Sequence, residues 1–176
     1  MSYSKEFVVL DKRIHDRDSF DCGESELNRF IRDQAARLMG AGISKTMVLP
    51  ATLSLPNGKT PICAFYSIAP SLIKRDDLPA LISKNLPCYP IPVFLLAQLA
   101  VHKEFTGLGL GKVALINALE YFNNISAHIP AYAVVVDCLN QNAEGFYLRY
   151  GFRELCKYNG RSRLYIPMKQ VSELFK

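Results

Sequence analysis

The chain contains 176 residues, of which 49% are hydrophobic and 21% charged. This balance excludes a disordered, collagen-like or low-complexity protein. At about 100 to 200 residues per domain, the length favours a single domain over residues 1–176 with a core of its own. The longest apolar run, residues 91–97, is much shorter than the roughly 18 residues of a membrane span.

The N-terminus and the metal-binding residue types favour a cytoplasmic protein without a metal centre. Residues 1–6 lack the apolar segment and cleavage site of a secretory signal, so we expect a cytoplasmic location and no membrane association. The five cysteines form no C-x-x-C pair, and the three histidines lie in separate segments. These spacings argue against both a disulfide framework and a zinc site.

Positive charge is concentrated toward the C-terminus of this chain of net charge +5. Residues 149–176 contain seven Lys and Arg against two Asp and Glu, whereas residues 1–42 contain seven against eight. Tyr150, Tyr158 and Tyr165 are interleaved with the C-terminal basic residues. Such a surface can attract an RNA backbone and stack on bases, although an ordinary solvated surface is the simpler explanation of a modest excess.

The first part of the chain predicts a short strand and an amphipathic helix. Residues 7–10 are β-branched and aromatic, as in a strand. Asp21 followed three positions later by Glu24 resembles an acidic helix-start signal. The helix that follows has apolar residues on one face and arginines on the other, and it ends at Gly40. The arginines form either a solvent face or one wall of a substrate groove.

A hairpin and a surface excursion are expected next. The β-like runs 46–55 and 62–68 flank the turn sequence Pro56-Asn57-Gly58. Residues 70–92 contain five prolines, which predict a surface excursion with at most a short helix.

The second half alternates strands and helices. A nearly continuous apolar run predicts a strand that is covered on both faces. The expected elements are a strand over 93–101, a helix over 113–122, a strand over 132–139, a helix over 141–150, and closing strands over 152–158 and 163–167. This order predicts a mixed sheet with helices packed on it.

A glycine turn connects the strand over 93–101 to the following helix. It reads Thr106-Gly107-Leu108-Gly109-Leu110-Gly111-Lys112, and its backbone N–H groups can converge on a phosphate at the positive end of the helix dipole. Lys112 breaks a dinucleotide fingerprint, and Thr106 and Val113 break a Walker loop. A pyrophosphate held without a metal-binding hydroxyl suits a carrier that is not cleaved at phosphorus, such as coenzyme A.

Two motifs together resemble those of the GNAT superfamily of acyl-CoA N-acyltransferases. One is Leu99-Ala100-Val101 followed by the glycine turn, and the other is Asn140-Gln141-Asn142-Ala143 with Phe146-Tyr147 and Gly151-Phe152. The resemblance covers residues 92–152. It implies an α/β (α+β) GNAT fold with a mixed, mostly antiparallel sheet, flanking helices and a splayed central strand pair. Thr106 departs from the family, which commonly has Gln or Arg there to help hold the pyrophosphate; Lys112 or Lys103 could compensate.

Further segments resemble the GNAT toxins of bacterial toxin–antitoxin pairs. These are residues 20–24 with Leu27 and Phe30, residues 91–93, and the ending 164–169. The resemblance implies transfer of acetyl from acetyl-CoA to the amino group of aminoacyl-tRNA, a block of translation, silencing by a ribbon-helix-helix antitoxin, and a homodimer. Many of these toxins have Arg where this chain has Gln98, a difference that bears on toxicity and on the tRNA recognised.

The proposed chemistry is direct attack of an amine on a thioester. An α-amine has a pKa of about 7.7 to 8.0 and is partly neutral near pH 7, whereas a lysine amine at about 10.4 needs a dedicated base. The core motifs offer no obvious base, which favours an α-amine acceptor. The resemblance implies that Tyr147 is the general acid for the departing thiolate. The alternative is a core tyrosine whose hydroxyl lies at the surface.

The expected site residues fall into three groups, with Tyr147 as the catalytic residue. The expected coenzyme-binding residues are Leu99, Ala100, Val101, Thr106, Gly107, Leu108, Gly109, Leu110, Gly111, Lys112, Asn140 and Phe146. The expected tRNA-binding residues are Arg29, Arg32, Arg37, Arg161 and Arg163.

Two other functions stay open. One is a GNAT enzyme that acts on a small amine or a protein N-terminus, which would need an acidic or closed acceptor pocket. The other is a catalytically idle GNAT domain that serves as a binding partner, an interpretation suggested by Thr106 and Gln98.

Overall fold

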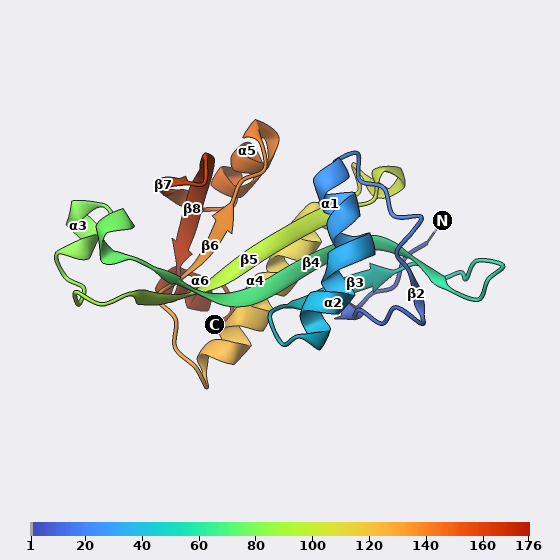
Figure 1. Ribbon diagram of the computed structural model, residues 1–176, viewed down its shortest axis with the longest axis horizontal. Coiled ribbons are helices and arrows are strands. Elements are labelled where there is room, and N and C mark those ends of the chain that lie inside the picture. The colour runs from blue at the N-terminus through green and yellow to red at the C-terminus, as the bar shows by residue number, and fades with distance from the viewer. Residues whose placement is uncertain (1) are drawn as a thin grey trace. The chain divides into compact units, whose positions relative to one another are not determined.

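The computed structural model describes residues 2–176 and divides them into two compact units (Figure 1). The first unit contains the chain up to Ala69 together with Ala97–Ala118, and the second contains Pro70–Leu96 and Leu119–Lys176. The single domain expected over residues 1–176 stays a prediction.

The first unit is built on an antiparallel hairpin. Strand β3 (Lys45–Pro50) pairs with β4 (Thr60–Ile73), and β1 (Val8–Val9) pairs with β3 on its other edge. The short strand β2 (His15–Asp16) pairs in parallel with β4. Gly58 has a positive φ of 81° in the connecting turn. The predicted hairpin is therefore confirmed, although β3 ends at Pro50, before the expected boundary.

A helical run packs on this hairpin and differs from the predicted helix. It consists of α1 (Ser25–Arg29), a π-helical turn (Phe30–Gln34) and α2 (Ala35–Gly40). The apolar face is confirmed, because Phe30 and Ile31 are buried and the Phe30 ring stacks on Phe65 of β4 at 6.1 Å.

The predicted start of this helix is wrong. The N-cap is Glu24, whose side chain makes no capping hydrogen bond, and the helix begins at Ser25. The Asp21 carboxylate binds Lys103 instead, a partner 82 positions away in the sequence, so local spacing could not reveal it.

The second unit contains the C-terminal strands. Part of β5 (Ile91–Val101) pairs in parallel with β6 (Ala133–Asp137) through Phe94↔Val134 and Leu95↔Val135. Strand β8 (Arg161–Pro167) pairs antiparallel with both β6 and β7 (Arg153–Tyr158). Helix α5 (Gln141–Arg149) follows β6, as predicted.

The eight strands form one mixed, mostly antiparallel sheet in the order β1-β3-β4-β5-β6-β8-β7, with β2 on β4. Helices α4 (Leu110–Ser126) and α5 flank it, so the expected α/β (α+β) fold class is confirmed. The splay of the central strand pair stays a prediction.

Two segments depart from the expected elements. Strand β4 continues to Ile73 before the short helices Arg75–Asp77 and α3 (Ala80–Ser83). Helix α6 (Met168–Glu173) is also too short to show a helical period in the sequence. No helix within residues 2–176 is long and apolar enough to cross a membrane.

Candidate functional site

The glycine turn of the first unit has the conformation of an open anion cradle. Gly107 and Gly109 have φ values of 80° and 77°, which strain any residue with a Cβ atom. A Cβ at either position would meet no atom within 4 Å, so the space beside the backbone is open. Buried Leu110 fixes the start of α4, whose first N–H groups have no partner inside the helix. The turn can therefore donate backbone hydrogen bonds to an anion.

The side chains around this turn contribute unequally. The Thr106 hydroxyl donates to the Lys103 carbonyl at 2.8 Å, so its proton is directed into the protein. The Lys103 ammonium is bound to Asp21 at 2.6 Å. Lys112 is exposed and has no ion-pair partner among residues 2–176. Of the two lysines that could compensate for Thr106, Lys112 is thus the one that stays available.

A network around Asp21 fastens the segment that leads into the turn. One carboxylate oxygen of Asp21 accepts from the Gly23 amide and the Asn28 side chain, both at 2.9 Å, and the other binds Lys103. The Lys103 amide also donates to the Asp21 carbonyl at 2.8 Å. The Lys103 ammonium and the Gly23 and Asn28 donors hold the pKa of Asp21 well below its usual range.

In the second unit, both ends of α5 fix the position of Tyr147. Asn140 caps the first turn, where its side-chain oxygen accepts from the Ala143 amide at 2.9 Å. At the other end Gly151 has a φ of 95°, and the Phe152 amide donates to the Tyr147 carbonyl at 3.2 Å. The Phe152 ring also packs on the Tyr147 ring at 5.3 Å, which completes a Schellman motif with its hydrophobic contact.

The Tyr147 side chain is buried among aromatic rings. The residue is only 7% exposed and packs between Phe146 and Phe152. Burial, with a smaller contribution from Cys138, raises the pKa of Tyr147 well above its ordinary value. Ser44 holds the single fully buried and unpartnered side-chain N or O atom within residues 2–176. Within residues 2–176 the Tyr147 hydroxyl makes no hydrogen bond, and its raised pKa keeps it a protonated phenol at neutral pH.

Two of the predicted arginines line one groove of the first unit. Arg29 and Arg32 border a groove of about 480 Å³, named the Gln98 groove here. Gln98 of β5 and Gln34 of the π-helical turn also line it, as do Ser25, Glu26 and Phe30. Sequence analysis did not associate Gln98 with these arginines, because the π-helical turn that orients them carries no sequence signature.

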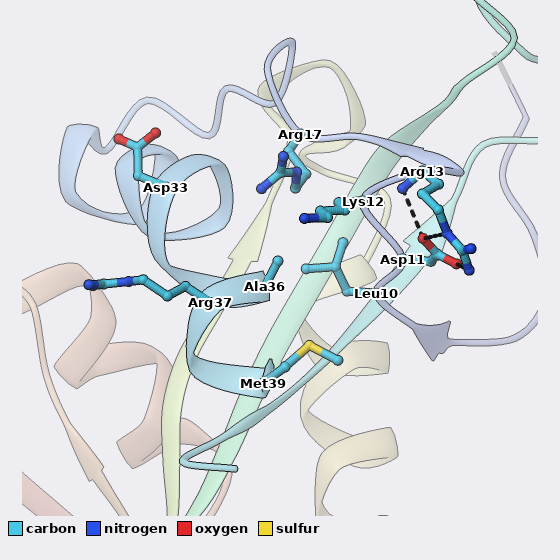
Figure 2. Close-up of a pocket in the computed structure, with 9 residues that line it drawn as sticks. All are labelled: Leu10, Asp11, Lys12, Arg13, Arg17, Asp33, Ala36, Arg37 and Met39. Atoms are coloured by element: carbon cyan, nitrogen blue, oxygen red, sulfur yellow. Dashed lines mark hydrogen bonds and ion pairs between the residues drawn. The ribbon is translucent and has the colours of Figure 1, made fainter. Parts of the chain in front are cut away.

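Arg37 lies in a different hollow of the same unit, the N-terminal groove, which has a volume of about 570 Å³ (Figure 2). Its lining residues are Leu10, Asp11, Lys12, Arg13, Arg17, Asp33, Ala36, Arg37 and Met39. Lys12, Arg13 and Arg17 were missed by sequence analysis, because the neighbouring Asp11, Asp16 and Asp18 cancel their charge along the chain.

The C-terminal arginines belong to the second unit. Arg163 is 6% exposed, and its guanidinium binds the Asp137 carboxylate through two contacts of 2.6 and 2.8 Å. It also stacks on the Tyr158 ring at 3.8 Å. These contacts hold the Arg163 side chain against Asp137 and Tyr158. The predicted tRNA contacts of Arg161 and Arg163 stay predictions. Tyr165, at 5% exposure, has no free face for a base.

Comparison with known proteins identifies the family. Residues 83–152 match the acetyltransferase (GNAT) family. A tRNA-acetylating toxin of Mycobacterium tuberculosis is 31% identical over 144 residues, which cover 80% of this chain and 82% of that protein. The chain therefore belongs to the GNAT acetyltransferase family. A probable toxin, TacT, of Sinorhizobium fredii is 26% identical and covers 94% of this chain and 92% of its own.

Solved structures agree with this assignment. A tyrosine-to-phenylalanine mutant of KacT superposes with a TM-score of 0.87 at 25% identity and covers 99% of this chain and 100% of its own. AtaT complexed with acetyl-methionyl-tRNAfMet gives a TM-score of 0.83 at 26% identity, over 97% and 99% of the two chains. AtaTR bound with acetyl-CoA gives a TM-score of 0.80 at 25% identity, over 97% and 98%.

Proposed function

We propose that this protein transfers the acetyl group of acetyl-CoA to the α-amine of aminoacyl-tRNA and so blocks translation. The observation that carries the proposal is Tyr147, a protonated phenol whose ring packs on Phe152 at the end of α5 and whose hydroxyl makes no hydrogen bond within residues 2–176. The named activity of the M. tuberculosis relative and the tRNA-bound state of AtaT support the choice of acceptor.

The glycine turn suits the pyrophosphate of acetyl-CoA. Its open backbone beside Gly107 and Gly109 can approach an anion closely, and exposed Lys112 adds a cation at the start of α4. We assign the diphosphate to residues 106–112 and the pantetheine arm to residues 99–101. Asn140 and Phe146 act through α5, since Asn140 caps that helix and Phe146 packs edge-on against Tyr147.

The transfer needs no covalent enzyme intermediate. The neutral α-amine attacks the thioester carbon, the C–S bond breaks as the N–C bond forms, and the Tyr147 hydroxyl gives its proton to the departing sulfur. The proton lost by the amine returns the phenolate to its neutral form, directly or through water. A raised phenol pKa keeps the proton available at neutral pH until the sulfur carries charge.

The toxin assignment also includes partners. We propose that a ribbon-helix-helix antitoxin silences the enzyme and that two copies of the chain form a homodimer. Relatives named as toxins over 80% and 94% of this chain support the first proposal. We assign Leu72 and Leu174, at 61% and 59% exposure, to the interface of that homodimer.

The central experiment compares wild type with Tyr147→Phe on total aminoacyl-tRNA and acetyl-CoA, with acetylated aminoacyl-tRNA measured by mass spectrometry. We expect the variant to lose turnover by about 10²-fold or more while it keeps its acetyl-CoA affinity and thermal stability. Tyr150→Phe, whose ring packs on Phe146, is the matched control and keeps its turnover. Near-normal turnover of Tyr147→Phe would remove this phenol from the mechanism.

The same assay separates the competing functions. Acetylation of a small amine or a protein N-terminus, with charged tRNA left unmodified, would assign a different acceptor. Absence of acetyl-CoA binding would support an idle domain. Growth arrest on expression, relieved by a ribbon-helix-helix protein encoded nearby, supports the toxin.

A further inference from the structure

The N-terminal groove carries a positive charge that its own carboxylates do not cancel. Asp11 accepts from the Arg13 amide and guanidinium at 2.8 to 3.2 Å and is therefore already paired. Asp33 also lines the groove, but its carboxylate pairs with Arg32, which does not line it. Within residues 2–176, Lys12, Arg17 and Arg37 have no carboxylate partner. The groove thus presents three cations to solvent.

Arg17 is held in place before any ligand binds. Its Nη1 donates to the Arg32 carbonyl at 2.8 Å, which ties the segment directly after β2 to the π-helical turn. A guanidinium has five N–H donors, so the others stay free for an anion. Figure 2 shows the Lys12 and Arg17 side chains beside the helical run, whereas Arg13 turns away to meet Asp11. Arg17 is therefore fixed before a ligand binds, and Lys12 lines the same groove.

Further basic side chains lie along the helical run. Arg37 borders the N-terminal groove, and Arg29 and Arg32 border the Gln98 groove on the same run. Arg29 and Arg37 are eight residues apart, or about 12 Å at the rise of a helix. One extended ligand with regularly spaced negative charges can contact both grooves, which a single small anion cannot do.

We propose that Lys12 and Arg17 bind the sugar–phosphate backbone of the tRNA substrate, with Arg37 as a further contact. The inference rests on the proposed function and adds a docking surface to it. Arginine donors match phosphate oxygens in pairs, and an RNA backbone supplies one charge per nucleotide. A short acidic protein segment is the competing occupant, but it does not supply charges at such regular intervals.

The test removes two positive charges from the N-terminal groove of the full chain. The variant is Lys12→Gln with Arg17→Gln, and its charge-matched control is Lys5→Gln with Lys59→Gln, which lie outside both grooves. Arg17→Lys keeps the charge and separates electrostatics from the link to Arg32. Deacylated bulk tRNA is the binding probe, titrated between 50 and 200 mM salt, roughly the range in which phosphate contacts dominate.

We expect the groove variant to bind bulk tRNA about 20-fold more weakly near 0.1 M salt. The slope of log affinity against log salt should fall by about 1.5 to 2, as the loss of two phosphate contacts predicts. The control pair and Arg17→Lys should keep the wild-type slope. A groove variant that matches the control in affinity and slope overturns the proposal, including the case in which the groove binds an acidic protein segment.

Acetylation assays show whether the lost charges affect tRNA docking or the acetyl transfer itself. The groove variant should show a raised KM for aminoacyl-tRNA but wild-type kinetics with puromycin, a small aminoacyl-nucleoside analogue that lacks the RNA backbone. Equal losses with both substrates, or a lowered Tm, would indicate general damage and reject a docking role. If wild type acetylates neither substrate, the proposed function fails, and the tRNA-binding slopes still decide the assignment of the groove.

Discussion

At the residue scale, the environment of a titratable group decides its role. The Tyr147 phenol is buried without a charged partner, so burial raises its pKa and keeps its proton. Arg163 is buried as well, but the Asp137 carboxylate raises the pKa of its guanidinium and holds it in a fixed pair. The first arrangement suits proton donation, and the second joins strands β6 and β8.

His15 couples stability to pH. It is 4% exposed, and its Nδ1 accepts a hydrogen bond from the Asp11 amide at 3.0 Å, which only the neutral ring can do. Burial lowers the pKa of His15 below its ordinary 6.5. At pH values between 6.5 and the lower folded-state pKa, His15 binds a proton in the unfolded chain but not in the folded one. The contribution of His15 to the free energy of unfolding is therefore fully present above about pH 6.5 and is lost as the pH falls below it.

We therefore expect the urea midpoint to drop between pH 7.5 and pH 5.5, and His15→Gln to reduce that drop. Exposed His128→Gln serves as the control and should behave as wild type. An NMR titration of the His15 ring in the unmodified protein gives an independent reading. A ring that titrates at or above the ordinary value would refute this account.

At the element scale, the C-terminal cap of α5 positions the Tyr147 phenol, which we propose as the general acid. Gly151 has a φ of 95°, and an added Cβ would lie 3.2 Å from Nε2 of the Gln170 side chain. We expect Gly151→Ala to destabilise the protein by about 1 to 2 kcal/mol and to lower turnover, because the Schellman contact orients Tyr147. Denaturant unfolding and acetyl transfer provide the measurements.

The same helix supplies the control. Gly145 lies inside α5 with open space at its Cβ position and an ordinary φ. Gly145→Ala should leave turnover intact and stabilise the protein by up to about 1 kcal/mol. Equal effects of the two substitutions would mean that the cap does not position Tyr147.

The Asp21–Lys103 pair acts on the element that precedes the glycine turn. Asp21→Asn keeps a side-chain oxygen for the Gly23 amide but loses the charge that binds Lys103. We expect a several-fold higher KM for acetyl-CoA with little change in kcat, because the turn is loosened while the phenol is untouched. Glu104→Gln, in the same short helix as Lys103 (Lys103–Phe105) but outside the pair, is the control. An unchanged KM for Asp21→Asn would show that the turn holds its shape without the pair.

At the scale of the whole molecule, exposed apolar side chains and net charge govern association. A homodimer should show twice the 19.8 kDa mass of the chain in sedimentation. Combining Leu72→Lys with Leu174→Lys should shift it toward the monomer, because charges on an apolar contact surface oppose association. Leu53→Lys, on a hairpin residue that is 68% exposed, should leave the mass unchanged. Sedimentation velocity measures the mass of each variant. A monomeric wild type would contradict the proposed homodimer.

The amino-acid sequence by itself determined most strands and helices and the glycine turn, because periodicity and positive φ are local properties, and the resemblance of its two motifs indicated the family. The Gln141–Arg149 helix and the glycine-led start of α4 follow from such local chemistry. Only the tertiary structure decided which charges are free. Asp21 meets Lys103 across 82 positions, Arg163 meets Asp137 across 26, and Arg17 reaches the carbonyl of Arg32 across 15. Such partners are chosen by the packing of distant segments, which no local pattern encodes.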